Sequence, residues 1–553
     1  MYPGMKGYEI HRYGVWMLAF ILLICVSAKA QVADVEITHE CDTVWHFGYQ
    51  GVNLYDREMH RIDIVYPSVD ANGDPITLSG SIIIPSNLYD GSDPVDGILL
   101  YNRYTQIKSK YAPTCGFAEG EFVFMATPLN PNWILVESDF YGFGITGEHI
   151  ADQYYVYGDT NGHASIDCLI AARKVLDSRN ISQGKFLLNA GYSSGGYDAI
   201  ATQRVRDMAH RDDIVFDKTI AGGAPFDLKQ AYKDYIEHKD DSTQQTVFAV
   251  IVLNTLMRHH DISLTTKEIF KEPLASKLDD WYNSGKYSIN AMKDSLRKVG
   301  NKLTQFIQPA LLDPESDEYN MLMAAFDRHD LTNDWYPDYS QRYFYMHYTR
   351  DNAVPSSSGR RLLKFLSKQG FKKSIVPEFT NLQTCMYVVS DNHTLGGIHF
   401  LLHLAATLSA YPILYCDGEL NTYYYDLIKD STPMGIVKQL EKKGYNLSAA
   451  FSGLSGTPTT GLTTLIGLMA TLNLYDKTVQ EWGTNMGELI QIAEDSGLEM
   501  DELVKIINYL KKQNRSAKPE EVQEEAELFI CDYLYDYLCE WLNNSDIDLD
   551  SIE

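Results

Sequence analysis

One serine in this chain lies in a sequence setting that could make it a nucleophile. Ser193 is the centre of Gly191-Tyr192-Ser193-Ser194-Gly195, which fits the pattern G-x-S-x-G. The pattern is typical of a sharp turn from a strand into a helix, where small glycines let the two elements approach closely. The first N–H groups of the helix would then point at the group that the serine attacks. The alternative interpretation is a glycine-rich serine turn without chemistry.

A nucleophilic serine needs a general base, and the base needs a carboxylate that orients it. Asp351 and His393 follow Ser193 in the order that hydrolases with this pattern use, each just past a predicted strand. Because the carboxyl ends of parallel strands meet at one sheet edge, the three side chains can converge there. His399 is an alternative base inside a predicted helix, whereas a loop position favours His393. Asp391 is an alternative acid, but it is very close in sequence to His393.

The elements that must hold these side chains follow from an alternation of apolar runs and amphipathic segments. Apolar runs of strand length predict a sheet buried on both faces, and segments with helical period predict the helices between them. Such an alternation indicates an α/β fold with a mainly parallel sheet. Strands 61–66 and 77–85 form an N-terminal hairpin around an Asp/Asn/Gly turn. The other expected strands are 97–102, 133–139, 186–190, 217–225, 342–347 and 383–390, and the expected helices include 165–177, 193–208 and 398–409.

The N-terminus has the three parts of a secretory signal peptide. Basic residues such as Lys6 and Arg12 precede the apolar run 15–26, and Ser27-Ala28-Lys29-Ala30 follows. We expect a signal peptide over 1–30 with cleavage after Ala30, and therefore a secreted or periplasmic protein. A membrane anchor is the alternative, but the run is short for a span. No stable membrane span is expected after cleavage.

Charge and cysteine spacing narrow the classes of partner and cofactor. The formal net charge is −27, from 74 acidic and 47 basic residues. Such a surface repels phosphate backbones, so nucleic acid is not expected as a partner. No C-x-x-C pair or His/Cys cluster indicates a zinc site, and the serine chemistry requires no cofactor. We therefore expect neither a metal nor an organic cofactor.

Two regions depart from the strand and helix alternation. Segment 226–338 has helical patterns without a sheet-like run, which predicts a helical cap inserted over the carboxyl edge of the sheet. Segment 416–553 is helical and acidic and carries no catalytic pattern, so we expect a separate C-terminal helical domain. That domain could form a dimer face or bind a partner.

Taken together, these features resemble the α/β-hydrolase superfamily, and most closely its secreted lipase and esterase branch. The resemblance covers about 56–410, and it implies an α/β-hydrolase domain over 31–415 that contains the cap. The residues that carry it are Tyr66…Gly73…Pro75…Gly80…Pro85, Asp139-Phe140-Tyr141-Gly142-Phe143-Gly144, Gly191-Tyr192-Ser193-Ser194-Gly195-Gly196, and Asp351…Val354-Pro355 with His393.

One loop departs from the pattern of that superfamily. Where a His-Gly pair commonly follows the strand, this chain has Asn102-Arg103-Tyr104-Thr105. The oxyanion hole would use the backbone N–H of Ser194 and one N–H from this loop, that of Arg103 or Tyr104. Backbone donors tolerate changes of side chain, but the absence of the glycine can reshape the acyl pocket.

The leading hypothesis is a secreted serine hydrolase that cleaves carboxylic esters through an acyl-enzyme on Ser193. Its partner would be a small-molecule or polymer-borne ester, and it could form a homo-oligomer. A peptidase of the same fold is one alternative, with access limited by the cap. A non-catalytic binding protein on a hydrolase scaffold is the other, because fold alone does not establish function.

Overall fold

The computed structural model describes residues 35–49, 52–115, 132–209, 213–237, 243–371, 373–374, 381–387 and 392–414. The expected signal peptide and the expected C-terminal helical domain lie outside these residues. The described strands are β1 (Glu36–Tyr49), β2 (Val52–Val69), β3 (Pro75–Pro85), β4 (Gly97–Asn102), β5 (Trp133–Ser138), β6 (Phe186–Tyr192), β7 (Lys218–Gly222), β8 (Tyr343–Tyr348), β9 (Lys373–Ser374) and β10 (Leu382–Tyr387).

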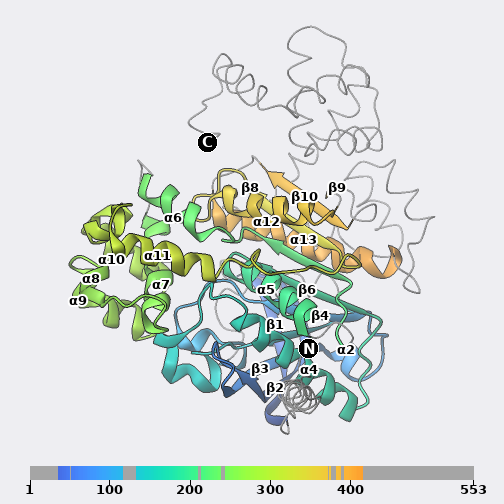
Figure 1. Ribbon diagram of the computed structural model, residues 1–553. Helices are drawn as coiled ribbons and strands as arrows, with labels where there is room; N and C mark the ends of the chain where they lie inside the picture. The colour runs from blue at the N-terminus through green and yellow to red at the C-terminus, as the bar shows by residue number, and fades with distance from the viewer. Residues whose placement is uncertain are drawn as a thin grey trace, which may run out of the picture.

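These ten strands form one sheet in the order β1-β2-β3-β5-β4-β6-β7-β8-β10-β9 (Figure 1). The first three neighbouring pairs, up to β3 with β5, are antiparallel, and all later pairs are parallel. The predicted α/β fold with a mainly parallel sheet and an N-terminal hairpin is confirmed. Strand β1 was not foreseen, because an edge strand pairs on one side only and carries a weak apolar pattern.

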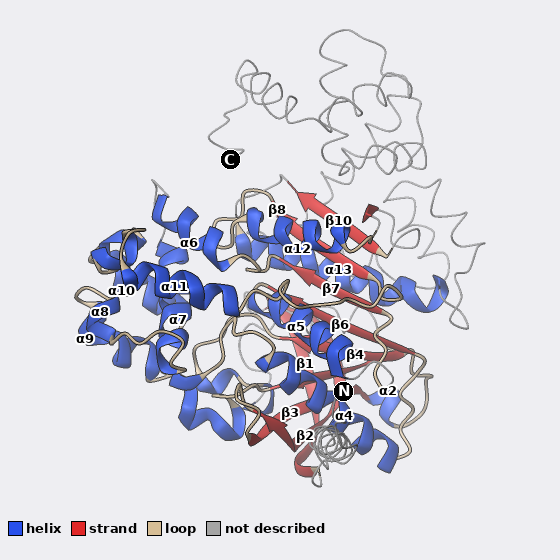
Figure 2. Ribbon diagram, viewed as in Figure 1, coloured by secondary structure: helices blue, strands red, loops and turns tan. Residues whose placement is uncertain are grey.

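Helices cover both faces of the sheet (Figure 2). Alternate residues of β4 show this, since successive side chains of a strand point to opposite faces. Ile98 and Leu100 pack in one core cluster with helix residues such as Leu169, whereas Leu99 packs in another with Phe400. Leu169 and Phe400 belong to helices on opposite faces. Outside the segment between β7 and β8, the α-helices of the described residues are α2 (Ser86–Tyr89), α4 (Thr160–Ser178), α5 (Ser194–Ala209), α12 (Ser356–Lys368) and α13 (His393–Leu414).

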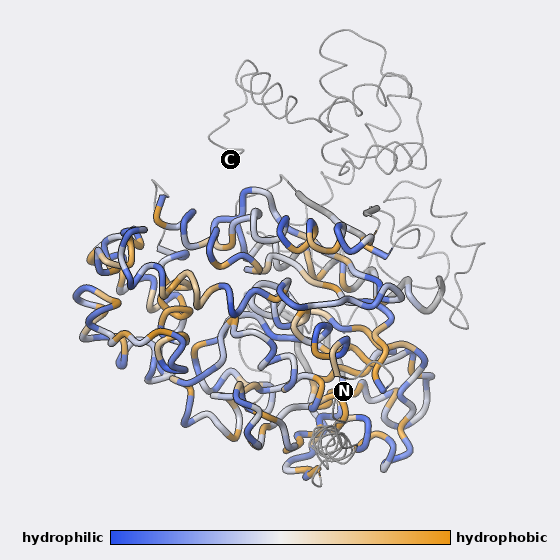
Figure 3. The backbone as a smooth tube through the Cα atoms, in the orientation of Figure 1, coloured by the Kyte–Doolittle hydropathy of each residue, from blue (hydrophilic) through white to orange (hydrophobic). Residues whose placement is uncertain are grey.

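The segment between β7 and β8 consists of helices that lie together at the left of Figure 1. Hydrophobic and hydrophilic stretches alternate along them (Figure 3). One buried cluster joins their residues Val250, Leu296 and Leu322 to Tyr343 and Tyr345 of β8, so these helices share a core with the sheet. They are α6 (Leu228–Glu237), α7 (Thr243–Arg258), α8 (Thr266–Ile269), α9 (Leu274–Leu278), α10 (Ile289–Arg297) and α11 (Asp317–Arg328).

None of the helices in the described part of the chain combines the length and the apolarity that crossing a membrane requires.

Candidate active site

The turn between β6 and α5 holds Ser193 in a strained backbone conformation. Its φ angle is 60°, a region that residues other than glycine rarely adopt. A Cβ added at Gly191 would lie 2.0 Å from the carbonyl oxygen of Gly195, and one at Gly195 would lie 2.1 Å from that of Asn102. The N–H of Ser193 donates to the carbonyl oxygen of Gly222 at 2.8 Å. Both glycines are therefore required by space, as the pattern predicts for this turn.

Ser193, His393 and Asp351 form one hydrogen-bonded row. The Nε2 atom of His393 lies 2.8 Å from Oγ of Ser193, and its Nδ1 atom lies 2.6 Å from Oδ2 of Asp351. A carboxylate oxygen can only accept, so Nδ1 carries the proton and Nε2 accepts from the serine hydroxyl. All three residues are buried. This is the arrangement in which an imidazole can take a proton from a serine.

The Asp351 carboxylate is held from its other side by the backbone. The N–H groups of Ala353 and Val354 donate to its Oδ1 at 2.8 and 2.9 Å. Burial raises the pKa of Asp351, but its interactions with His393 and the hydrogen bond from the Val354 N–H contribute to a larger opposite effect, and the net pKa lies below its usual value. The carboxylate therefore stays ionised beside the imidazole that it orients.

A second buried histidine supports this carboxylate. The Nε2 atom of His347 donates to the carbonyl oxygen of Val354 at 3.0 Å and lies 3.6 Å from Oδ2 of Asp351. Its Nδ1 atom accepts from the hydroxyl of Tyr345 at 2.8 Å. Burial lowers the pKa of His347, so the ring is neutral. His347 lies on β8, and its proximity to Asp351 could not be read from the sequence.

Tyr192 anchors the backbone of the candidate base, a role that the sequence analysis missed. Its hydroxyl donates to the carbonyl oxygen of His393 at 2.8 Å, and the two ring centroids are 5.0 Å apart. Glycines make room for the tyrosine, because a Cβ at Gly396 would lie 2.4 Å from its hydroxyl oxygen. The only sequence signal for this role is the position of Tyr192 directly before the nucleophile.

The loop position expected for His393 is wrong, because this residue is the first of helix α13. Its backbone N–H donates to Oδ1 of Asn352 at 3.3 Å, and the N–H of Gly396 donates to the carbonyl oxygen of Asn392 at 3.0 Å. These bonds start the helix earlier than the apolar pattern alone indicates.

The alternative base lies elsewhere. His399 is buried in α13, with its Nδ1 atom 3.2 Å from the hydroxyl of Tyr348 and its ring centroid 4.9 Å from that of His403. Burial holds the pKa of His399 well below its usual value. Asp391, the alternative acid, lies outside the described residues. Within the described ranges, no group of three or more His, Cys, Asp or Glu side chains is placed to hold a metal ion.

The loop that replaces the His-Gly pair begins with a buried asparagine that ties the turn to the sheet. The Nδ2 of Asn102 donates to Oδ1 of Asn189 at 2.8 Å, and its Oδ1 accepts from Ser165 at 2.7 Å and from Thr202 at 3.3 Å. These partners lie on β6, α4 and α5. The asparagine therefore fixes the carboxyl end of β4 against the elements that carry Ser193.

Arg103, a predicted oxyanion residue, directs its side chain away from solvent and into the scaffold. The guanidinium donates to the carbonyl oxygens of Tyr111 at 2.7 Å and Asp139 at 2.5 Å, and its carbon lies 4.6 Å from the ring centroid of Phe143. Thr105, two residues later, donates to Oγ of Ser194 at 3.1 Å. The predicted oxyanion residues Ser194, Arg103 and Tyr104 all line one polar pocket beside the turn.

That polar pocket also contains a buried carboxyl group. Asp198 of α5 is 3% exposed, and its Oδ1 accepts from Nδ2 of Asn161 at 3.2 Å. Burial raises the pKa of Asp198 to about 8, so the group is protonated in the folded protein at neutral pH. Its ordinary pKa is 3.8, so the folded state binds a proton that the unfolded state lacks between these values.

This difference predicts how stability depends on pH. A group whose pKa is higher in the folded than in the unfolded state stabilises the folded protein fully when the pH is below the pKa of the unfolded state. This stabilisation is lost as the pH rises through the pKa of the folded state. Asp198→Asn has no group that titrates here, so it does not lose this stabilisation. Between about pH 6 and pH 8, the free energy of unfolding of the variant relative to that of the wild type should rise by roughly 1.4 kcal/mol per pH unit. Urea unfolding of both proteins across this range measures it. Parallel curves for the two proteins would contradict the prediction.

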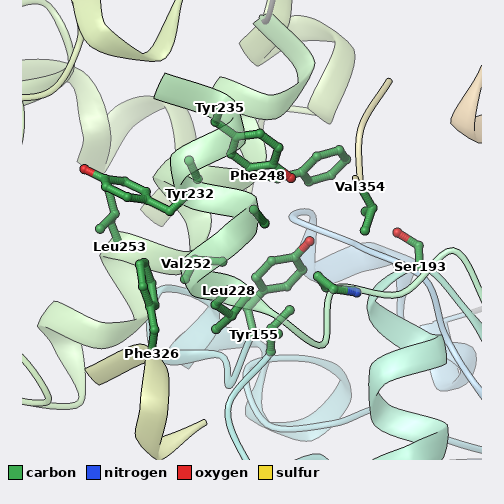
Figure 4. A pocket seen from close by; sticks show the side chains of 14 residues that line it. Tyr155, Ser193, Leu228, Tyr232, Tyr235, Phe248, Val252, Leu253, Phe326 and Val354 are labelled. Atoms are coloured by element: carbon green, nitrogen blue, oxygen red, sulfur yellow. The ribbon is translucent and has the colours of Figure 1, made fainter. Parts of the chain in front are cut away.

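An apolar cavity begins at Ser193 and continues beneath the helices between β7 and β8. Figure 4 shows Ser193 and Val354 at one end of this cavity and Phe326 at the other. Leu228 and Val252, from α6 and α7, lie between them. The candidate nucleophile therefore opens onto a hydrocarbon-lined space.

A parallel sheet with a strained serine after β6, an aspartate after β8 and a histidine after β10 defines the α/β-hydrolase fold. Solved structures confirm it. The chain is similar to a Legionella pneumophila protein described as an inferred hydrolase (16% identity, TM-score 0.55), with 69% of this chain and 98% of that one covered. It is also similar to the rice cell wall degrading esterase LipA of Xanthomonas oryzae (17%, 0.51; 69% and 97% covered). The closed state of Candida antarctica lipase A is a further similar structure (13%, 0.50; 68% and 81% covered).

No family model matches the sequence. No curated protein is similar to it at the sequence level. The likeness to the esterase and the lipase is therefore a likeness of fold.

Proposed function

We propose that the protein is a serine hydrolase that cleaves carboxylic esters through an acyl-enzyme on Ser193. The observation that carries the proposal is the continuous hydrogen-bonded row from Ser193 through His393 to Asp351. The row supports the proposal because Nδ1 of His393 carries the ring proton, so its Nε2 atom can accept the proton of the serine hydroxyl.

In the first half-reaction, Nε2 of His393 takes the hydroxyl proton as Oγ of Ser193 bonds to the ester carbonyl carbon. The carbonyl oxygen becomes an oxyanion, for which the backbone N–H of Ser194 and that of Arg103 or Tyr104 are the proposed donors. The bond to the alcohol oxygen then breaks, and His393 returns its proton to that oxygen. An acyl group remains on the serine.

In the second half-reaction, a water molecule gives a proton to His393 and attacks the acyl carbon. The tetrahedral intermediate collapses, the bond to Oγ breaks, and the serine recovers its proton. Asp351 remains ionised throughout and stabilises the imidazolium that forms twice in the cycle. Its two backbone hydrogen bonds keep the carboxylate in place during both transfers.

A fluorophosphonate probe tests the proposal directly, because it forms a stable phosphonyl ester with an activated serine. We expect one adduct per chain, on the peptide that contains Ser193, as mapped by mass spectrometry after proteolysis. Heat-denatured protein is the control, since an unfolded chain lacks the activating histidine. An adduct elsewhere, or none on the folded protein, would contradict the proposal and favour a binding protein on this fold.

A further inference from the structure

We propose that the apolar cavity binds an aliphatic acyl chain, and that Phe326 and Tyr232 form the end wall that limits its length. The inference rests on the proposed function, since it names the acyl group that Ser193 would carry. Under this inference Phe326 determines which chain lengths the protein accepts. This role does not follow from the hydrogen-bonded row at Ser193.

The lining of the cavity offers hydrocarbon surface and almost no hydrogen bonds. Apart from Ser193 and three tyrosines, every lining side chain is Val, Leu, Ala, Pro or Phe. The three tyrosine hydroxyls are already engaged. Tyr155 is paired with Thr105 at 2.8 Å, and Tyr232 and Tyr235 donate to backbone carbonyl oxygens at 3.0 and 2.5 Å.

This chemistry separates substrate classes. A sugar or peptide group that entered the cavity would give up its hydrogen bonds to water without replacement, which is unfavourable for each buried group. An alkyl chain has no such hydrogen bonds, and its free energy becomes more favourable with each methylene that leaves water. The lining therefore favours an aliphatic chain over polar groups.

The position of the cavity assigns it to the acyl side of the ester. The leaving alcohol must receive its proton from Nε2 of His393, so its oxygen lies beside that ring. The cavity is lined by Ser193 but not by His393. It therefore suits the part of the substrate that stays bonded to Oγ after the alcohol has left.

The far end of the cavity is closed by packed aromatic rings. Figure 4 places Tyr232, Leu253 and Phe326 opposite Ser193. The Tyr232 and Phe326 centroids are 5.6 Å apart, and the Tyr232 hydroxyl is fixed to the carbonyl oxygen of Leu311. All three end residues are buried. A chain that reaches them cannot extend without displacing a side chain.

The test is a series of p-nitrophenyl esters from acetate to palmitate, each assayed below its critical micelle concentration. For the wild type, kcat/KM should rise roughly fourfold for each added methylene, the equivalent of ~0.8 kcal/mol, until the chain reaches the wall. Phe326→Ala should move the optimum to longer chains. Val252→Phe, which fills the middle of the cavity, should move the optimum to shorter chains.

Phe365→Ala is the matched control. It makes the same chemical change on α12, where the Phe365 ring stacks on Trp335 at 5.4 Å outside the cavity, so the chain-length profile should not change. Because the two cavity variants move the optimum in opposite directions, a loss of stability in one of them cannot imitate the expected pair of results.

Two failures have different signatures. Ser193-dependent acetate turnover with a flat chain-length profile, or a profile unchanged in both cavity variants, would overturn the acyl-chain inference and leave the proposed function intact. Absence of any Ser193-dependent turnover would overturn the proposed function. In that case, calorimetry of dodecanoate binding to Ser193→Ala tests the cavity without turnover. Absence of binding would overturn the acyl-chain inference as well.

Discussion

Replacing Ser193 by alanine is expected to lower kcat for p-nitrophenyl acetate by a factor on the order of 10⁶, to near the background rate. The variant keeps the oxyanion donors and the cavity but has no Oγ to form the acyl-enzyme. The effect belongs to kcat rather than KM, because the serine hydroxyl contributes little to ground-state binding. Initial rates corrected for spontaneous hydrolysis measure it.

The neighbouring serine supplies the control for this variant. Ser194→Ala keeps its backbone N–H and loses only the contact of its Oγ with Thr105, so fluorophosphonate labelling at Ser193 should persist. Circular dichroism should show both variants folded, since alanine is smaller than serine at both sites. Undiminished turnover by Ser193→Ala would show that Ser193 is not the nucleophile.

Asp351→Asn is the second large effect, with an expected fall in kcat on the order of 10⁴. The asparagine amide can donate to Nδ1 of His393, which moves the ring proton to Nε2. In that tautomer Nε2 cannot accept the serine proton, although the geometry is unchanged. The same comparison of kcat on a short-chain ester measures the loss, and fluorophosphonate labelling should slow in parallel.

Asp391→Asn is the matched control, because Asp391 is the alternative acid in the sequence. We expect its kcat to remain within a few-fold of the wild type. A large loss in Asp391→Asn together with a small one in Asp351→Asn would assign the orienting carboxylate to Asp391 and remove Asp351 from the proposed mechanism.

Much of the fold and of the candidate nucleophile followed from local sequence patterns. Apolar runs and helical periods predicted the parallel strands, since these patterns depend on residues only a few positions apart. The glycines around Ser193 predicted its turn, because a Cβ at Gly191 or Gly195 would overlap backbone atoms. The chain order of serine, acid and histidine then limited the candidates for their partners.

The choice between the two histidines required the tertiary structure. His393 and His399 lie on the same helix, six residues apart, which places them about 120° apart around its axis. Only the packing of α13 against the sheet decides which ring faces Ser193. The hydroxyl of Tyr192 contributes to that choice by holding the backbone of His393.

The sequence by itself determined the strained turn at Ser193, the parallel sheet and a short set of catalytic candidates, because each depends on neighbours along the chain. Tertiary structure alone decided the supports and the cavity. Tyr192 reaches the backbone of His393, 201 positions away, and the Tyr232 and Phe326 rings of the end wall meet from two different helices. Such contacts arise from the packing of distant elements, which no local pattern records.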